Sequence, residues 1–149
     1  MKKFIKIFTV ICTFILILCS VGCSVRRAVS ADTFKKEAGK EGFTVSEKTS
    51  SDSNVDKCLM ASKKGSDTKI IYLSFGDSSS AHDSYTSMIG DVIPSGGKNA
   101  VDSDTYNKYS VSKGELYYTI TRMDATIIYC SATVAKKGEA DGFIKALKY

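Results

Sequence analysis

Side chains that could do nucleophilic or acid–base chemistry are few and scattered in this 149-residue chain. His82 is the only histidine, so a histidine-based zinc site or a Ser-His-Asp relay would depend on it. No second histidine and no Cys-x-x-Cys pair accompanies it, although a zinc site needs several ligands at defined spacing. The serines at 78–80 lack the G-x-S-x-G pattern of a nucleophilic serine and fit a helix cap instead. We therefore expect His82 to be an exposed helical residue without a catalytic role.

The carboxylates and glycines give no stronger pattern. Asp77 with Asp83, or Asp102 with Asp104, could form a calcium site or an acid and base pair. Neither spacing matches the calcium loop, which has a glycine at its sixth position and a final glutamate. The Gly-Gly-Lys stretch at 96–98 lacks the rest of a phosphate-binding loop. The sequence thus predicts no catalytic residue, metal or cofactor, and it favours a protein that is not an enzyme.

The first 22 residues have the layout of a secretory signal. Lysines at positions 2, 3 and 6 form a basic start, and residues 7–21 carry no charge. A membrane-spanning helix needs about 20 apolar residues, so this run favours cleavage over a permanent anchor. An uncleaved hydrophobic anchor is the alternative.

The apolar run ends in Ser20-Val21-Gly22-Cys23. This ending resembles the lipobox of bacterial lipoproteins, in which an aliphatic or small residue and then Gly or Ala precede an invariant cysteine. Ser20 departs from the leucine usual at that place. The resemblance implies cleavage before Cys23, a diacylglyceryl thioether on its sulfur, and a lipid anchor at the extracytoplasmic face of the cell membrane. Two acyl chains suffice for stable anchoring, whereas one gives only marginal binding.

Net charge excludes one class of partner. The chain has 21 basic and 16 acidic residues, but removal of the signal with its three lysines would leave 18 basic residues and a net charge of +2. So small a net charge does not indicate a protein that binds nucleic acid. Arg26 and Arg27, directly after the cysteine, could lie against anionic lipid headgroups. We expect a signal peptide at 1–22, the lipidated cysteine and a short tether at 23–29, and a single extracytoplasmic domain at 30–149.

The elements expected in that domain define an α+β fold. Ser30 caps a first helix, which Gly42 ends. Apolar periodicity and turn residues predict strands at 57–62, 68–75, 106–111, 115–123 and 126–134, and helices at 80–92 and 136–148. Residues 47–56 and 95–104 are expected to be loops. Two ββα units could then pair edge to edge in one antiparallel sheet, with the helices packed mainly on one face. A signal followed by such a domain resembles the small lipoproteins of Gram-positive-type bacteria, a resemblance that implies no activity.

An open sheet face would be unusually aromatic. If one face packs under the helices, the period-2 alternation of strands sends the following residues to the other: Ile70, Tyr72, Tyr117, Thr119, Ile127 and Tyr129. Tyrosine is enriched at interfaces, so Tyr72, Tyr117, Tyr129, Ile70 and Ile127 are the predicted binding residues. A plain two-residue turn at Asp124-Ala125 would pair Ile120 with Tyr129 and invert this assignment. Strand propensity alone is the other explanation of these tyrosines.

Cys58 and Cys130 are the thiols left to the domain. Export favours a disulfide between them. Cys130, however, alternates with Ile128 and Ala132 on a strand face that is expected to be buried, where a free cysteine packs as a small apolar residue. We predict buried, reduced thiols.

These observations favour a lipid-anchored, non-enzymatic binding module. Its ligand would be a protein partner, an envelope polymer or a small solute. Two alternatives are a small cell-envelope hydrolase, whose carboxylates converge only in the fold, and a structural subunit of a membrane complex.

Overall fold

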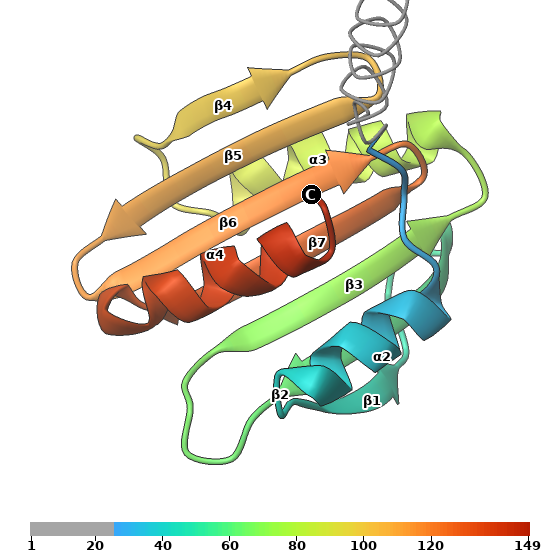
Figure 1. The fold of residues 1–149 in the computed structure, drawn as a ribbon. Helices are drawn as coiled ribbons and strands as arrows, with labels where there is room; N and C mark the ends of the chain where they lie inside the picture. Colours follow the sequence, from blue (N-terminus) through green and yellow to red (C-terminus); the bar gives the residue numbers. More distant parts are fainter. Residues whose placement is uncertain (1–25) are drawn as a thin grey trace, which may run out of the picture.

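The computed structural model describes residues 26–149, and this part of the chain folds into one sheet with three α-helices (Figure 1). The helices are α2 (Ala31–Lys40), α3 (Ser78–Asp91) and α4 (Lys137–Ala146), the last preceded by a 3-10 turn, η1 (Val134–Lys136). The strands are β1 (Thr44–Lys48), β2 (Val55–Ser62), β3 (Lys69–Phe75), β4 (Lys98–Asp102), β5 (Tyr106–Lys113), β6 (Leu116–Met123) and β7 (Thr126–Thr133).

The sheet has seven antiparallel strands in the order β1-β2-β3-β7-β6-β5-β4. Strands β3 and β7 pair at its centre, so the two ββα segments do meet edge to edge. A two-residue turn at Asp124-Ala125 joins β6 to β7 and pairs Ile120 with Tyr129. The α+β class is confirmed.

Two of the three helices share one face of the sheet, as predicted, but the third covers the other face, so the expectation of an open face is wrong. Figure 1 shows α2 and α4 in front of the sheet and α3 behind it. Two separate apolar clusters result, one under α2 and α4 and the other under α3. The reason lies in the central strands, where apolar residues follow one another without a break, as in residues 70–73 and 127–130. Such strands need cover on both faces.

The predicted open face is part of the interior. Ile70, Tyr72 and Tyr117 belong to the cluster under α2 and α4, whereas Ile127 and Tyr129 belong to the cluster under α3. None of the five side chains is more than 8% exposed. Because of the two-residue turn, Ile127 and Tyr129 of β7 lie on the opposite face of the sheet from Tyr117 of β6. Helices cover both faces, so neither group stays exposed. The prediction that these residues form a solvent-facing binding surface is therefore wrong.

The edge strands β1 and β4 lie in segments expected to hold no strand. Both are largely exposed on both sides, so their residues show no alternation of apolar and polar types. They form because β2 and β5 offer them backbone hydrogen bonds.

Helix α3 also starts earlier than predicted: Asp77 is its N-cap and accepts a hydrogen bond from the backbone N–H of Ser80 at 2.8 Å.

Cys58 and Cys130 are free thiols, as predicted, but only Cys130 is fully buried, so the predicted burial of Cys58 is wrong. Burial raises the pKa of the Cys130 thiol. Cys130 belongs to the cluster under α2 and α4. Cys58 directly precedes Leu59, which enters that same cluster, so Cys58 points to the opposite face of β2, and β3 separates β2 from β7. Neighbouring strands lie about 4.8 Å apart, which places the two cysteines beyond disulfide distance.

Packing of the domain begins at Arg26 rather than at Ser30. The Arg26 guanidinium lies 4.6 Å from the centre of the Tyr106 ring. The Val29 N–H donates to the Tyr149 hydroxyl at 3.2 Å, and the Val29 carbonyl accepts from the Tyr72 hydroxyl at 3.1 Å. Burial raises the pKa of Tyr149 to about 12. Within residues 26–149, no helix is long and apolar enough to cross a membrane. Cys23 and the predicted lipobox at 20–23 lie outside the described residues.

Gly97→Ala is expected to lower the free energy of unfolding by about 1–3 kcal/mol, because the site has no room for a methyl group. A Cβ there would lie 2.6 Å from the Ser110 carbonyl oxygen and would overlap the Tyr109 ring. Gly90→Ala is the matched control: nothing lies within 4 Å of the place that its methyl group would take in α3, so a gain of about 0.5–1 kcal/mol is expected. Urea unfolding measures both changes. Equal stabilities of the two variants would contradict the close packing of Gly97 against Tyr109 and Ser110 of β5.

Candidate functional site

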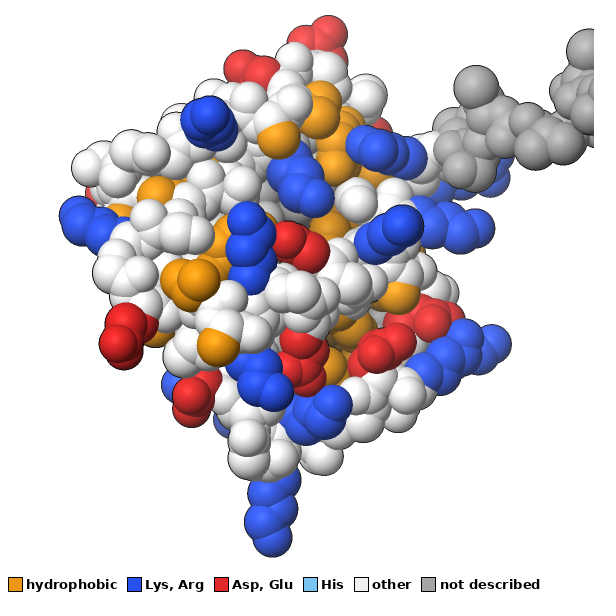
Figure 2. Space-filling view, turned by 60° about the vertical axis from the view of Figure 1, so that its left-hand side comes forward, with side chains coloured by type: hydrophobic (Ala, Val, Ile, Leu, Met, Phe, Trp, Pro, Cys, Tyr) orange, Lys and Arg blue, Asp and Glu red, His pale blue; other side chains and the backbone are white. Residues whose placement is uncertain are grey.

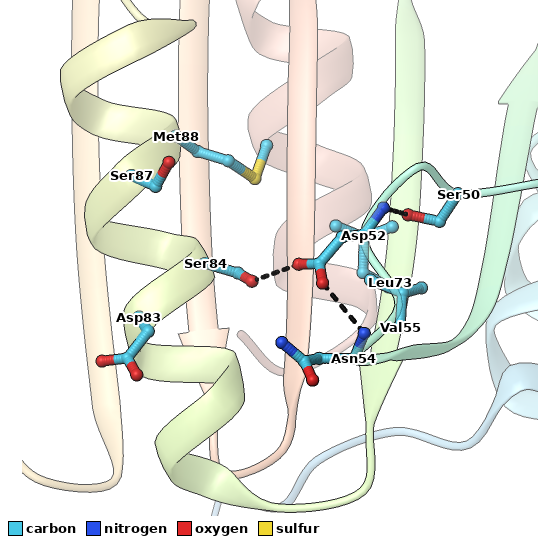
Figure 3. Close-up of a pocket in the computed structure, with 9 residues that line it drawn as sticks. All are labelled: Ser50, Asp52, Asn54, Val55, Leu73, Asp83, Ser84, Ser87 and Met88. Carbon is cyan, nitrogen blue, oxygen red and sulfur yellow. Dashed lines mark hydrogen bonds between the residues drawn. The ribbon is translucent and has the colours of Figure 1, made fainter.

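A hollow of about 370 Å³ lies between α3 and the loop that joins β1 to β2 (Figure 3). We call it the Asp52 pocket. It is lined by Ser50, Asp52, Asn54, Val55, Leu73, Asp83, Ser84, Ser87 and Met88.

The Asp52 carboxylate is held in place from both sides. One oxygen accepts a hydrogen bond from the Ser84 hydroxyl of α3 at 2.8 Å, and the other accepts from the Asn54 N–H at 2.9 Å. The Asp52 N–H in turn donates to the Ser50 hydroxyl at 3.1 Å. Each carboxylate oxygen has a further lone pair available. The loop therefore presents a fixed, negatively charged acceptor to the hollow.

The remaining lining is apolar at one side and polar at the other. Val55, Leu73 and Met88 pack against the cluster under α3 and form the apolar wall. Ser87 lies on the polar side, and its hydroxyl donates to Asp91 at 3.0 Å. No Lys, Arg or His lines the pocket, and α3 itself contains no Lys or Arg. The pocket thus combines a carboxylate, hydroxyl groups and an apolar wall without a compensating cation.

The carboxylates of this region do not form an acid and base pair. In Figure 3 the Asp83 side chain points away from Asp52. Asp77 caps α3, and the hydrogen bonds from Ser80 lower the pKa of its carboxyl. Asp102 accepts a hydrogen bond from the Asn107 amide at 2.6 Å. Residues 26–149 contain no group of three or more His, Cys, Asp or Glu that could hold a metal ion. His82 is exposed on α3, as predicted.

Large apolar patches are missing from the surface that the described residues form in Figure 2. The side chains of Lys and Arg are spread over this side, and apolar side chains appear only in small groups between them. The large apolar residues that are exposed, Val92, Val101, Leu116 and Val134, come from different elements. This surface gives no support to a subunit that assembles through a broad apolar face.

Arg122 was not singled out by sequence reasoning, and it organises the end of the sheet beside α3. Its side chain is 0% exposed. Nε donates to the Asn107 amide oxygen at 2.6 Å. The two terminal nitrogens donate to the Ser78 hydroxyl and to the carbonyls of Ser103, Asp104 and Asp124, at 2.7–3.2 Å.

All five donors of this guanidinium are therefore used by neutral acceptors. They tie the start of α3 to the β4–β5 and β6–β7 turns. Arg122 has no donor left for a ligand, so its role is to position α3 against the sheet. The sequence held one signal of this burial. Arg122 lies two residues after Ile120 on β6, so both side chains point to the same buried face of the sheet.

Comparison with known proteins supports the fold. No protein-family model and no curated protein matches the chain. Among solved structures, a GTP-binding regulator from Thermotoga maritima is similar, with a TM-score of 0.52 and 15% sequence identity. The similarity covers 80% of this chain and 84% of that one. At this identity the likeness shows the arrangement of helices and strands alone.

Proposed function

We propose that this protein is a lipid-anchored binding module at the extracytoplasmic face of the cell membrane, and that the Asp52 pocket binds a cationic side chain of a protein partner. The signal and the lipobox ending at Cys23 support the anchor. The geometry of the pocket supports the ligand class.

The observation that carries the ligand class is a fixed carboxylate next to an apolar wall, with no cation in the lining. Lys and Arg side chains have an apolar stem and a charged head. The stem would pack on Val55, Leu73 and Met88, and the head would donate to Asp52 and to the serine hydroxyls. Charge-assisted hydrogen bonds of this kind are the strong ones. The hollow, at about 370 Å³, has room for one such side chain.

Asp52→Asn tests the ligand class, because it removes the charge and keeps the shape. The probe is n-butylguanidinium, with n-butanol as an uncharged probe of equal apolar length. We expect the affinity for n-butylguanidinium to fall about tenfold or more, since a hydrogen bond to a charged group contributes about 1.5–3 kcal/mol. Shifts of the Ser84 and Ser87 amide signals in NMR titrations measure it.

Asp67→Asn, at an exposed position in the β2–β3 turn, is the control and should bind the probe like the native chain. Equal affinities of the Asp52→Asn variant and the native chain would show that the pocket does not recognise a cation.

Cys23→Ala tests the anchor separately. The variant should lose labelling by a fatty-acid analogue and accumulate as a longer precursor, because cleavage is expected to follow lipidation of this sulfur. Cys19→Ala is the matched control within the same apolar run and should be labelled normally. A Cys23→Ala protein that is still labelled and still has the mature size would rule out the lipoprotein hypothesis.

A further inference from the structure

The face of the sheet that carries α2 and α4 is only partly covered by helices. Figure 1 shows these helices in front of β1–β3 and β7, whereas none of the helices formed by residues 26–149 lies in front of β4 and β5. Lys108 of β5 lies two residues after Tyr106, which enters the cluster under α2 and α4, so both side chains point to this face. Lys98 of β4 pairs with Ser110, which points the same way. Two lysines therefore stand on the uncovered strands.

One flank of α4 adds two further lysines beside these strands. The Lys137 ammonium lies 4.9 Å from the centre of the Tyr117 ring of β6, and the Tyr117 hydroxyl donates to Asp141 at 2.6 Å. Lys145 follows Asp141 by four residues and so lies on the same flank of the helix. Figure 2 shows Lys and Arg side chains gathered in its upper right part, with few acidic side chains between them.

Two arginines extend this surface towards the start of the described chain. A hollow of about 310 Å³ is lined by Arg26, Arg27, Thr105, Tyr106, Met123 and Asp124. Both arginines are exposed, and the hollow has two cations against one carboxylate. Guanidinium groups suit phosphate, because they can donate two parallel hydrogen bonds to it. We call six cations of this side the basic face: Arg26, Arg27, Lys98, Lys108, Lys137 and Lys145.

The helix on the opposite face of the sheet has the opposite charge. Helix α3 contains Asp83 and Asp91 but no Lys or Arg. The Asp52 pocket lies beside this helix and adds a third carboxylate there. An anionic surface would therefore attract the basic face and repel the side of the molecule that carries α3.

The chain length before Arg26 brings the basic face close to the proposed anchor. Arg26 lies three residues after Cys23, and three residues span at most about 11 Å. The attraction of an anionic membrane for Lys and Arg falls off within a Debye length, which is about 8–10 Å at physiological salt. Lipid on Cys23 would thus hold Arg26 and Arg27 within reach of the headgroups.

We infer that the basic face lies on the anionic phospholipid headgroups of the membrane that holds the anchor, with a lipid phosphate bound between Arg26 and Arg27. Helix α3 and the Asp52 pocket then face away from the membrane, where a protein partner can reach them. The inference rests on the lipid anchor proposed above and not on the ligand of the Asp52 pocket.

Lysine acetylation on vesicles tests this orientation. The lipidated mature protein is placed in vesicles of phosphatidylcholine alone, or of phosphatidylcholine and phosphatidylglycerol in equal parts. A water-soluble acetylating reagent is added, and mass spectrometry follows each lysine. We expect Lys98, Lys137 and Lys145 to react at least about threefold more slowly on the vesicles with phosphatidylglycerol, because the headgroups cover them. High salt should remove this difference.

Lys69 and Lys113 are the internal controls and should react equally on both kinds of vesicle. Lys69 directly precedes Ile70 of the cluster under α2 and α4, and Lys113 lies two residues after Val111 of the cluster under α3. Both lysines therefore point to the face that carries α3, and both are exposed.

A pair of double variants separates a specific face from net charge. Lys108→Gln with Lys145→Gln removes two cations from the basic face, so Lys98 and Lys137 should lose most of their protection, since each cation near an anionic membrane contributes about fivefold to binding. Lys69→Gln with Lys113→Gln changes the net charge equally and should leave the protection unchanged.

Equal acetylation of the basic face on both kinds of vesicle would overturn the inference, and so would equal losses of protection in the two double variants. Protection by soluble polyglycerol phosphate but not by phosphatidylglycerol would overturn it as well and would assign the face to an envelope polymer. A protein that does not stay on neutral vesicles would contradict the anchor instead, and the pattern on anionic vesicles would still decide the basic face.

Discussion

Arg122→Leu is expected to lower the free energy of unfolding by about 3 kcal/mol or more. The substitution leaves the Asn107 amide oxygen and the carbonyls of Asp104 and Asp124 without this donor, whereas the Ser103 carbonyl keeps the Asn107 amide. A buried acceptor left unpaired costs about 1–3 kcal/mol, and the Asn107 amide oxygen is such an acceptor, whereas the carbonyls of the two turns are partly exposed and cost less. Removal of a buried charge offsets part of this loss, since its desolvation is no longer needed. The sum remains strongly destabilising because several acceptors lose their partner at once.

Urea unfolding followed by circular dichroism measures the effect. Arg27→Leu, the same change at an exposed arginine, should stay within about 0.5 kcal/mol of the native chain. Arg122→Lys should lie near Arg122→Leu, because one ammonium group cannot reach acceptors arranged around a planar guanidinium. An Arg122→Leu variant within about 1 kcal/mol of the native stability would show that the hydrogen bonds do not hold α3 to the sheet.

Phe34→Ala is expected to cost about 3–5 kcal/mol, the range for truncation of a buried phenylalanine. Phe34 is the residue through which α2 enters the core, and it is 0% exposed. Its ring centre lies 5.3 Å from that of Tyr72 and 5.7 Å from that of Phe143, the latter in an edge-to-face arrangement. The variant loses apolar burial, two aromatic contacts and the seat of α2 on the sheet.

Thermal and urea unfolding provide the measurement for this second variant. Lys35→Ala, at the neighbouring exposed position of α2, is the control and should leave the stability unchanged or slightly higher, because alanine favours helix. Phe34→Leu should fall between the two. A loss of less than about 1.5 kcal/mol for Phe34→Ala would mean that α2 contributes little to the core.

The position of the candidate site follows from the two-sided cover of the sheet. With α2 and α4 on one face and α3 on the other, the central strands offer no open surface. The Asp52 pocket remains at a flank of α3, where this single helix meets the β1–β2 loop. Binding at this flank would leave the apolar clusters undisturbed.

Local signals in the sequence determined much of the α+β domain. Ser30 and the left-handed Gly42 bound α2, as their positions predicted. The two-residue turn after Met123 sets the register of β6 and β7. These features depend on neighbouring residues, whose hydrogen bonds and backbone angles are decided within a few positions of the chain.

The tertiary structure alone decided which surfaces are free and which residues form the sites. Asp52 and Ser84 are 32 positions apart, and Arg122 and Ser78 are 44 apart. No periodicity shows that such side chains meet, because their hydrogen bonds form only after the strands have paired. The prediction of five exposed binding residues failed for the same reason: a strand pattern shows that a face is apolar, but only the packing of α2 and α4 on one face and of α3 on the other shows that these residues are covered. Burial is a property of the whole fold, since it depends on what distant segments place against a surface.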